Sequence, residues 1–264
     1  RQQDLGPGLQ AQELVRQVER VGHHFRRLPG DLRVHSRQVV RQEPEVVFDG
    51  SDGSPATHDL AASYTTTTQV LTETFAALAE AGVALDGMIL KTSMVLAGKK
   101  APVQTDADTV GLETLKALLK TVPAETAGVV FLSGGQGDEQ ATANLDGVHR
   151  AAQTRFAEAR DAAVAELRAE GHTTRADAVA NLTALPWPVS YSFGRGLQAK
   201  ALKAWGGKST QVAAAQVAMI ANAREVQAAR QGRLAEAKRS TRLRATAAAM
   251  VPPTGGILAA DESV

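Results

Sequence analysis

Four short apolar runs in this 264-residue chain each end in a polar or glycine-rich turn, and they constrain the fold more than any other feature. They occupy residues 86–95, 131–136, 189–195 and 256–263. Before and after the first run, apolar residues recur at helical spacing. They are Leu71, Phe75 and Leu78, then Leu112, Leu115, Leu119 and Val122. Alternation of strands and helices predicts an α/β fold with a parallel sheet and right-handed crossovers.

Lys91 stands near the end of the first run, Met88-Ile89-Leu90-Lys91. An ammonium at the tip of a buried strand is poorly solvated, so we expect the pKa of Lys91 to fall. A deprotonated lysine can attack a carbonyl carbon and form a Schiff base. A lysine at a strand end can also be a surface residue, so the residue alone does not decide between the two.

The four runs together resemble class I fructose-bisphosphate aldolase, the family that forms a Schiff base. Residues 85–95 resemble its Schiff-base strand and 131–136 its phosphate-binding turn. Residues 191–207 resemble the last barrel strand with the following helix, and 256–263 the first strand. The resemblance implies a TIM (β/α)8 barrel, here partial or permuted and with extra helices, that needs no metal and no cofactor.

The resemblance also implies catalytic roles for three residues at the carboxyl ends of strands, where barrels of this kind build their active sites. Lys91 would attack the substrate ketone. Glu43, in a Glu-Pro-Glu turn, would shuttle protons during imine formation, and Asp261 would take the hydroxyl proton as the carbon–carbon bond breaks. The strand before Glu43 contains Arg41, which would put a charge into a core strand.

Two glycine-rich turns are expected to bind phosphate, because glycine lets backbone N–H groups approach an anion at a helix N-terminus. The first is Ser133, Gly134 and Gly135, and the second is Gly194 and Arg195. The guanidinium of Arg195 suits a phosphate, and Ser263 is expected to bind the second phosphate of a bisphosphate substrate.

The chain departs from the family pattern in two ways. The family's first strand comes last here, which a circular permutation or a joining of fragments would explain. Five of eight strands can be assigned, and no segment matches the middle strands that carry two further active-site lysines in the family. Residues 39–264 are thus assigned to an aldolase-like barrel region, with a helix inserted between about 138 and 184. Residues 1–38 stay unassigned, and their arginine-rich composition favours a solvated or disordered segment.

Composition narrows the function classes. Net charge is +1 and cysteine is absent, which fits a reducing compartment. We find no apolar run near 18 residues and no signal-peptide pattern, so we expect a cytoplasmic protein without a membrane partner. The basic cluster Lys238, Arg239, Arg242 and Arg244 lacks interleaved aromatic residues, so we expect a solvated helix face and no nucleic-acid partner.

Two functions remain open from the sequence. One is an enzyme that cleaves fructose 1,6-bisphosphate into dihydroxyacetone phosphate and glyceraldehyde 3-phosphate through an imine on Lys91. The other is a non-catalytic aldolase-derived fragment that binds sugar phosphate or needs a partner chain to complete the barrel. In both cases we expect a homo-oligomer, because missing strands leave sheet edges open.

Overall fold

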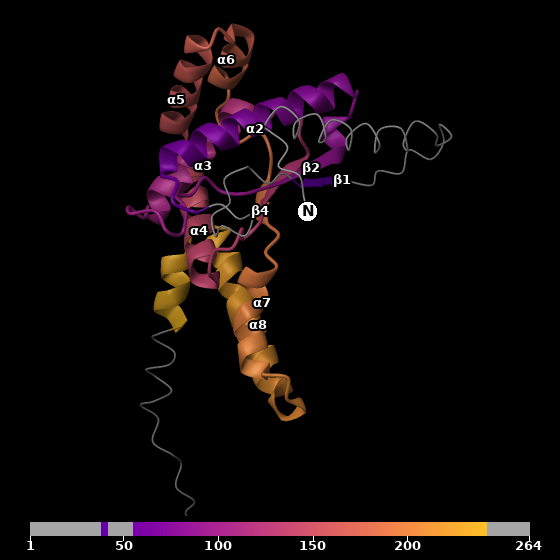
Figure 1. Cartoon of the computed structure of the whole chain (residues 1–264), viewed down its shortest axis with the longest axis vertical. Coiled ribbons are helices and arrows are strands. Elements are labelled where there is room, and N and C mark those ends of the chain that lie inside the picture. The colour runs from indigo at the N-terminus through magenta and orange to yellow at the C-terminus, as the bar shows by residue number, and fades with distance from the viewer. Residues whose placement is uncertain (1–37, 42–54, 242–264) are drawn as a thin grey trace, which may run out of the picture.

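The computed structural model describes residues 38–41 and 55–241, and these residues contain a four-stranded parallel sheet (Figure 1). The strands lie side by side in chain order, β1-β2-β3-β4. Their bounds are Gln38–Arg41 for β1, Met88–Thr92 for β2, Gly128–Phe131 for β3 and Val189–Tyr191 for β4. The predicted parallel neighbours near Val39, Met88, Val129 and Val189 are therefore confirmed. The fifth predicted strand, near Ile257, lies outside the described residues.

Helices connect and cover the strands. Between β1 and β3 they are α2 at Leu60–Glu80, the short η1 at Leu85–Gly87 and α3 at Ala107–Thr121. Between β3 and β4 they are α4 at Asp138–Thr154, α5 at Phe156–Ala169 and α6 at Thr173–Ala180. After β4 they are α7 at Arg195–Trp205, η2 at Ser209–Gln211 and α8 at Val212–Ala229.

The two faces of β2 have different surroundings. Met88, Leu90 and Thr92 are buried, whereas Ile89 and Lys91 on the opposite face are only half-buried. Met88 and Leu90 pack with apolar side chains of the covering helices, among them Leu71 of α2, Leu118 of α3 and Leu145 of α4. The main core therefore lies between the sheet and the helices, and Lys91 lies on the sheet's other face.

Helices α3 and α4 cross at a point where glycine is needed. A Cβ at Gly147 of α4 would lie 1.9 Å from the carbonyl oxygen of Ala107. A Cβ at Gly111 of α3 would lie 2.3 Å from the backbone of Gly147. These two glycines let the helix backbones touch, and this contact fixes α4 relative to the carboxyl end of β3.

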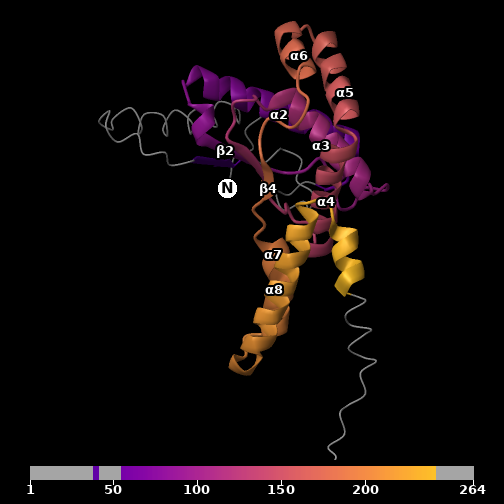
Figure 2. The same ribbon diagram turned by 180° about the vertical axis from the view of Figure 1, so that it is seen from behind.

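Helices α5 and α6 form a hairpin that lies over α2 and α3, on the side away from the α7–α8 hairpin (Figures 1 and 2). Its apolar stripe, which includes Ala163 and Leu167, packs on Leu115 and Leu119 of α3 in a second core. Glu166 of α5 lies 3.1 Å from the ammonium of Lys120 and accepts a hydrogen bond from Tyr64 at 2.7 Å. The predicted insertion of one helix is thus two helices, fastened by apolar packing and by ion pairs.

The final helical stretch is interrupted within the described residues. Helix α8 ends at Ala229, and Gly232 takes a positive φ of 67° before a new helical segment starts at Leu234. The carboxylate of Asp146 accepts a hydrogen bond from the Leu234 backbone N–H at 2.9 Å and caps this segment. Gly232 is a sequence signal for this break, but a single glycine in an alanine-rich stretch is also compatible with a continuing helix.

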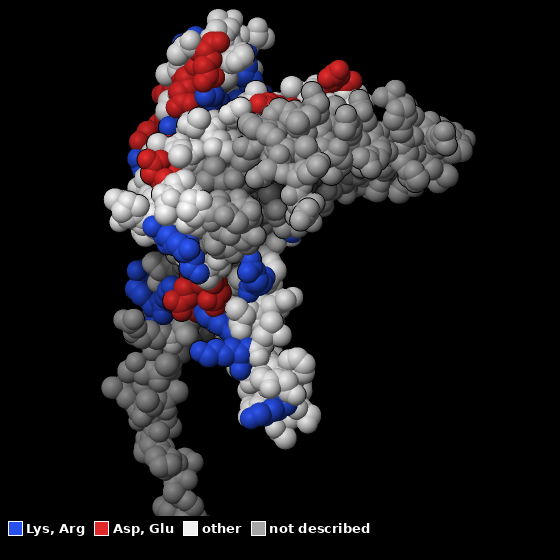
Figure 3. Space-filling model, viewed as in Figure 1, with Lys and Arg blue, Asp and Glu red and all other residues white. Residues whose placement is uncertain are grey.

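The α7–α8 hairpin extends away from the sheet (Figures 1 and 2). It exposes several apolar side chains. Residues 209–223 contain no charged residue, yet Val217 and Ile220 of this run are 68% and 52% exposed. Figure 3 shows broad white surface on this hairpin, interrupted by separate basic side chains, one of them near its far end. The basic residues Lys238 and Arg239 of the predicted solvated face are exposed.

Candidate active site

The candidate site lies at the carboxyl ends of β2, β3 and β4. The ladder of backbone hydrogen bonds continues just past the strands, from Leu132 N–H to the Thr92 oxygen at 3.0 Å and from Ser192 N–H to the Phe131 oxygen at 2.8 Å. The residues that follow the three strands therefore lie side by side along the carboxyl edge of the sheet. In parallel α/β proteins this edge of the sheet is where ligands bind.

Lys91 meets Ser192 at this edge. Lys91 pairs with Val130 of β3, and Val130 pairs with Ser190 of β4, so these three side chains share one face of the sheet. Ser192 follows two residues after Ser190, and the Lys91 ammonium donates a hydrogen bond to its hydroxyl at 3.1 Å. Lys91 is half-buried and Ser192 is exposed, so a small molecule can reach both groups.

The other described lysines with close partners are held by carboxylates. Lys116 and Lys120 lie 2.7 Å and 2.6 Å from glutamates. Lys200 lies 3.3 Å from Asp138 and 3.5 Å from Glu225. Burial acts against the charge of Lys200, but Glu225 and Asp138 outweigh it and raise the pKa of this amine. Lys200 is therefore held as an ammonium, whereas the hydrogen bond of Lys91 goes to a neutral hydroxyl.

The first glycine-rich turn joins β3 to α4. Gly134 and Gly135 have φ values of 56° and 83°, a conformation that glycine adopts without strain. The turn is closed by a hydrogen bond from Gln136 N–H to the oxygen of the buried Ser133 at 2.9 Å. Helix α4 begins directly afterwards at Asp138. A glycine turn that leads into a helix is the geometry expected for anion binding, though an acidic residue occupies the first helical position here.

The second glycine-rich turn joins β4 to α7 and touches the first. Gly194 is the N-cap of α7, and Arg195 is its first helical residue. A Cβ at Gly196 would lie 3.0 Å from the Cβ of Ser133, so the first turn of α7 packs against the β3–α4 turn. The structure thus brings together Lys91, Ser133, Gly134, Gly135, Gly194 and Arg195 at one end of the sheet.

Three predicted site residues have no structural description. Glu43, Asp261 and Ser263 lie outside the described residues, so their relation to Lys91 stays a prediction. Ser192, in contrast, was missed as a site residue although it lies in one of the four runs. The signal was its spacing, because residues two apart on a strand point to the same face and Ser190 aligns with Lys91.

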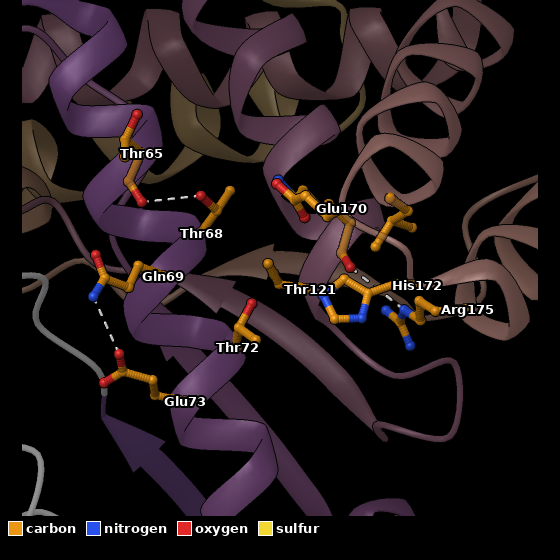
Figure 4. Close-up of a pocket in the computed structure, with 11 residues that line it drawn as sticks. Thr65, Thr68, Gln69, Thr72, Glu73, Thr121, Glu170, His172 and Arg175 are labelled. Carbon is orange, nitrogen blue, oxygen red and sulfur yellow. Dashed lines mark hydrogen bonds and ion pairs between the residues drawn. The ribbon is translucent and has the colours of Figure 1, made fainter.

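A separate cavity of about 450 Å3 lies between α2, α3 and the α5–α6 hairpin. Figure 4 shows Thr65, Thr68 and Thr72 of α2 on one wall, facing His172 and Arg175 across the cavity. Arg175 donates to the carbonyl oxygens of Leu119, Lys120 and Val122 at the end of α3. None of the site residues predicted from the sequence lines this cavity.

The described part of the chain has neither a metal-binding cluster nor a membrane-spanning helix. Residues 55–241 contain no group of three or more His, Cys, Asp or Glu side chains placed to hold a metal ion. No helix among the described residues has the length and apolarity needed to cross a membrane.

Comparison with known proteins points to one family. The family model described as fructose-bisphosphate aldolase class-I matches residues 35–158 and 165–244. A relative from Caenorhabditis elegans, fructose-bisphosphate aldolase 2, is 36% identical over 178 residues, which are 67% of this chain and 39% of that protein. The cytoplasmic isozyme 2 of fructose-bisphosphate aldolase from Pisum sativum is 36% identical over 182 residues, 69% of this chain and 40% of the relative.

A solved structure agrees with these relatives. Fructose-bisphosphate aldolase from Plasmodium falciparum, in a complex with TRAP and a small-molecule inhibitor, superimposes with a TM-score of 0.57 and 31% sequence identity. The match covers 75% of this chain and 46% of that structure. The predicted α/β fold of TIM-barrel type is confirmed, and the described residues contain part of its parallel sheet. The chain spans about 40% of the length of the curated relatives.

Proposed function

Since this chain belongs to the class I fructose-bisphosphate aldolase family, we propose that it acts on fructose 1,6-bisphosphate through an imine on Lys91. The reaction is reversible aldol cleavage of fructose 1,6-bisphosphate to dihydroxyacetone phosphate and glyceraldehyde 3-phosphate. The Lys91 amine adds to the substrate's ketone carbon, and loss of water leaves a protonated imine that accepts the electron pair of the breaking carbon–carbon bond.

One observation carries this proposal. Lys91 lies half-buried at the carboxyl end of a parallel strand, and its amine is held by the neutral hydroxyl of Ser192 at 3.1 Å. For comparison, Glu225 and Asp138 raise the pKa of the Lys200 amine and so favour its protonated form. Within the described residues, the hydrogen bond of the Lys91 amine goes to an uncharged side chain at the carboxyl edge of the sheet. This position supports a role for the Lys91 amine in the reaction.

The remaining roles belong to the same proposal. Glu43 serves as the proton shuttle of imine formation, and Asp261 takes the substrate hydroxyl proton. Phosphate groups bind at Ser133, Gly134 and Gly135, at Gly194 and Arg195, and at Ser263. The close approach of Gly196 to Ser133 supports the phosphate assignment, because it places the two glycine-rich turns next to each other.

The alternative is a non-catalytic fragment that needs a partner chain, and one observation favours it. In the described residues β1 and β4 are the outer strands of an open sheet, whereas a barrel has no free edge. A homo-oligomer would cover these edges. A cytoplasmic location stays part of the proposal, supported by the name of the relative from Pisum sativum.

Borohydride trapping tests the imine. The protein is incubated with dihydroxyacetone phosphate and sodium borohydride in the presence of a chelator, and the adduct is located by peptide mass spectrometry. We expect an adduct on Lys91 and none in Lys91→Arg, because a guanidinium stays protonated. Lys208→Arg, an exposed lysine beyond α7, is the matched control and should trap normally.

The same assay separates the two functions. For this chain in isolation we expect adduct without turnover of fructose 1,6-bisphosphate. Imine formation needs mainly Lys91 and a proton shuttle, whereas cleavage also needs the two lysines that the family carries on the middle strands missing here. Full turnover would contradict the need for a partner chain. A folded protein that forms no adduct would refute the imine and leave the non-catalytic fragment.

A further inference from the structure

Asn222 of α8 is a buried amide that holds the first turn of α7. Its side chain is 1% exposed, and its Nδ2 donates to the carbonyl oxygens of Gly196 at 3.1 Å and Leu197 at 2.9 Å. Both carbonyls follow directly after Gly194 and Arg195. The amide therefore fixes the part of α7 that begins the second glycine-rich turn.

The other end of the same amide has no partner. The Oδ1 atom of Asn222 is buried and makes no hydrogen bond within the described residues. A buried carbonyl without a donor costs free energy, and an apolar side chain of the same size would avoid that cost. Stability of the α7–α8 packing alone does not account for an asparagine at this position.

Gly196 carries the constraint from Asn222 to the first turn. Its backbone accepts from Asn222 on one side, and its Cα lies so close to Ser133 that a Cβ would be 3.0 Å from the Cβ of that serine. The Gly196 backbone is thus held between α8 and the β3–α4 turn. A shift of the first turn of α7 would change the distance between the two glycine-rich turns.

We propose that Asn222 is a positioning residue for phosphate binding, which sets the backbone N–H groups of Gly194 and Arg195 against the Ser133–Gly135 turn. This inference rests on the proposed function, because the anion that it concerns is the phosphate of that substrate. Asn222 itself does not touch the ligand. Its effect is confined to the phosphate and does not extend to the Lys91 amine on the neighbouring strand.

Two ketones separate this role from general stabilisation. Dihydroxyacetone phosphate needs Lys91 and the phosphate turns, whereas dihydroxyacetone needs only the amine. Borohydride trapping is measured against concentration for both, in wild type, Asn222→Leu and Asn222→Asp. Leucine removes the two donors at similar volume, and aspartate replaces the donor by an oxygen that repels the carbonyls. Asn181→Leu is the control, because the exposed Asn181 also donates to one backbone oxygen, at 2.9 Å, but on α6.

We expect the concentration of dihydroxyacetone phosphate for half-maximal trapping to rise roughly threefold to tenfold in both Asn222 variants, the size expected for lost hydrogen bonds. Trapping of dihydroxyacetone should stay unchanged, and Asn181→Leu should match wild type with both ketones. Equal losses for the two ketones, or no change for either, would overturn the positioning role.

Binding of inorganic phosphate provides a second test, which does not depend on Lys91. Its binding, measured by calorimetry, should weaken by the same factor in the Asn222 variants, and an unchanged affinity would overturn the inference. If wild type binds phosphate but traps neither ketone, the imine chemistry fails while the phosphate affinities still decide the role of Asn222.

Discussion

His149 of α4 makes the stability of this protein depend on pH. The side chain is half-buried, and its Nε2 is buried and has no hydrogen-bond partner among the described residues. Burial, with a smaller contribution from the charge of Arg230 and against the opposing effect of Asp146, lowers the pKa of His149 to about 4. The folded protein therefore keeps this ring neutral under conditions in which an unfolded chain would protonate it.

The sign and size of the effect follow from linkage. A histidine in an unfolded chain has a pKa of about 6.5. Below that value the unfolded state binds a proton that the folded state excludes, so stability falls as the pH drops from about 6.5 towards about 4. With these two values the loss between pH 7 and pH 5 is about 2 kcal/mol for this one residue.

Urea unfolding at pH 7 and pH 5 measures this loss in wild type and in His149→Met. Methionine has a similar volume and takes no proton, so the variant should lose about 2 kcal/mol less than wild type between the two pH values. All other titrating groups are common to both proteins and cancel in the difference. Equal losses in the two proteins would refute the argument that His149 is kept neutral by burial.

Two further predictions concern packing. Gly147→Ala should lower the free energy of unfolding by about 3 kcal/mol, because the new Cβ would lie 1.9 Å from the Ala107 oxygen. Gly87→Ala is the control, because a Cβ there meets nothing within 4 Å. Equal urea midpoints for the two variants would contradict the close contact between α3 and α4. Arg175→Met should lower the free energy of unfolding by about 2 kcal/mol, because three carbonyl oxygens at the end of α3 lose a hydrogen-bond donor. Amide hydrogen exchange should then rise first at that end of α3, and uniform exchange would argue against the cap.

Local sequence patterns predicted the helices and strands that have a regular apolar spacing. They did not predict features that depend on contacts between residues far apart in the chain. The periodicity of Leu71, Phe75 and Leu78 predicted α2, and all three are buried in it. The apolar runs predicted β2, β3 and β4, because buried strands of parallel sheets are apolar on nearly every residue. The end of α8 has no decisive local signal, since glycine in an alanine-rich stretch is compatible with a continuing helix. The break is accompanied by a tertiary contact, from the Leu234 N–H to Asp146.

The candidate site was predicted only in part for the same reason. Lys91 and the two glycine-rich turns have local signatures at strand ends. The hydrogen bond from Lys91 to Ser192 joins residues 101 positions apart, and only the strand register places them together. Asn222 has no signature at all, because an asparagine in a helix is ordinarily a solvent-facing residue. Its role is visible only from the carbonyls that it contacts.

The α5–α6 hairpin has a consequence for how this chain can be shortened. Leu115 and Leu119 of α3 are 0% and 1% exposed because the hairpin covers them, whereas the opposite side of α3 packs in the main core. Removal of residues 156–180 would therefore present these two leucines to water. A shortened chain is expected to be less soluble than the full chain, and polar residues at positions 115 and 119 should offset that loss.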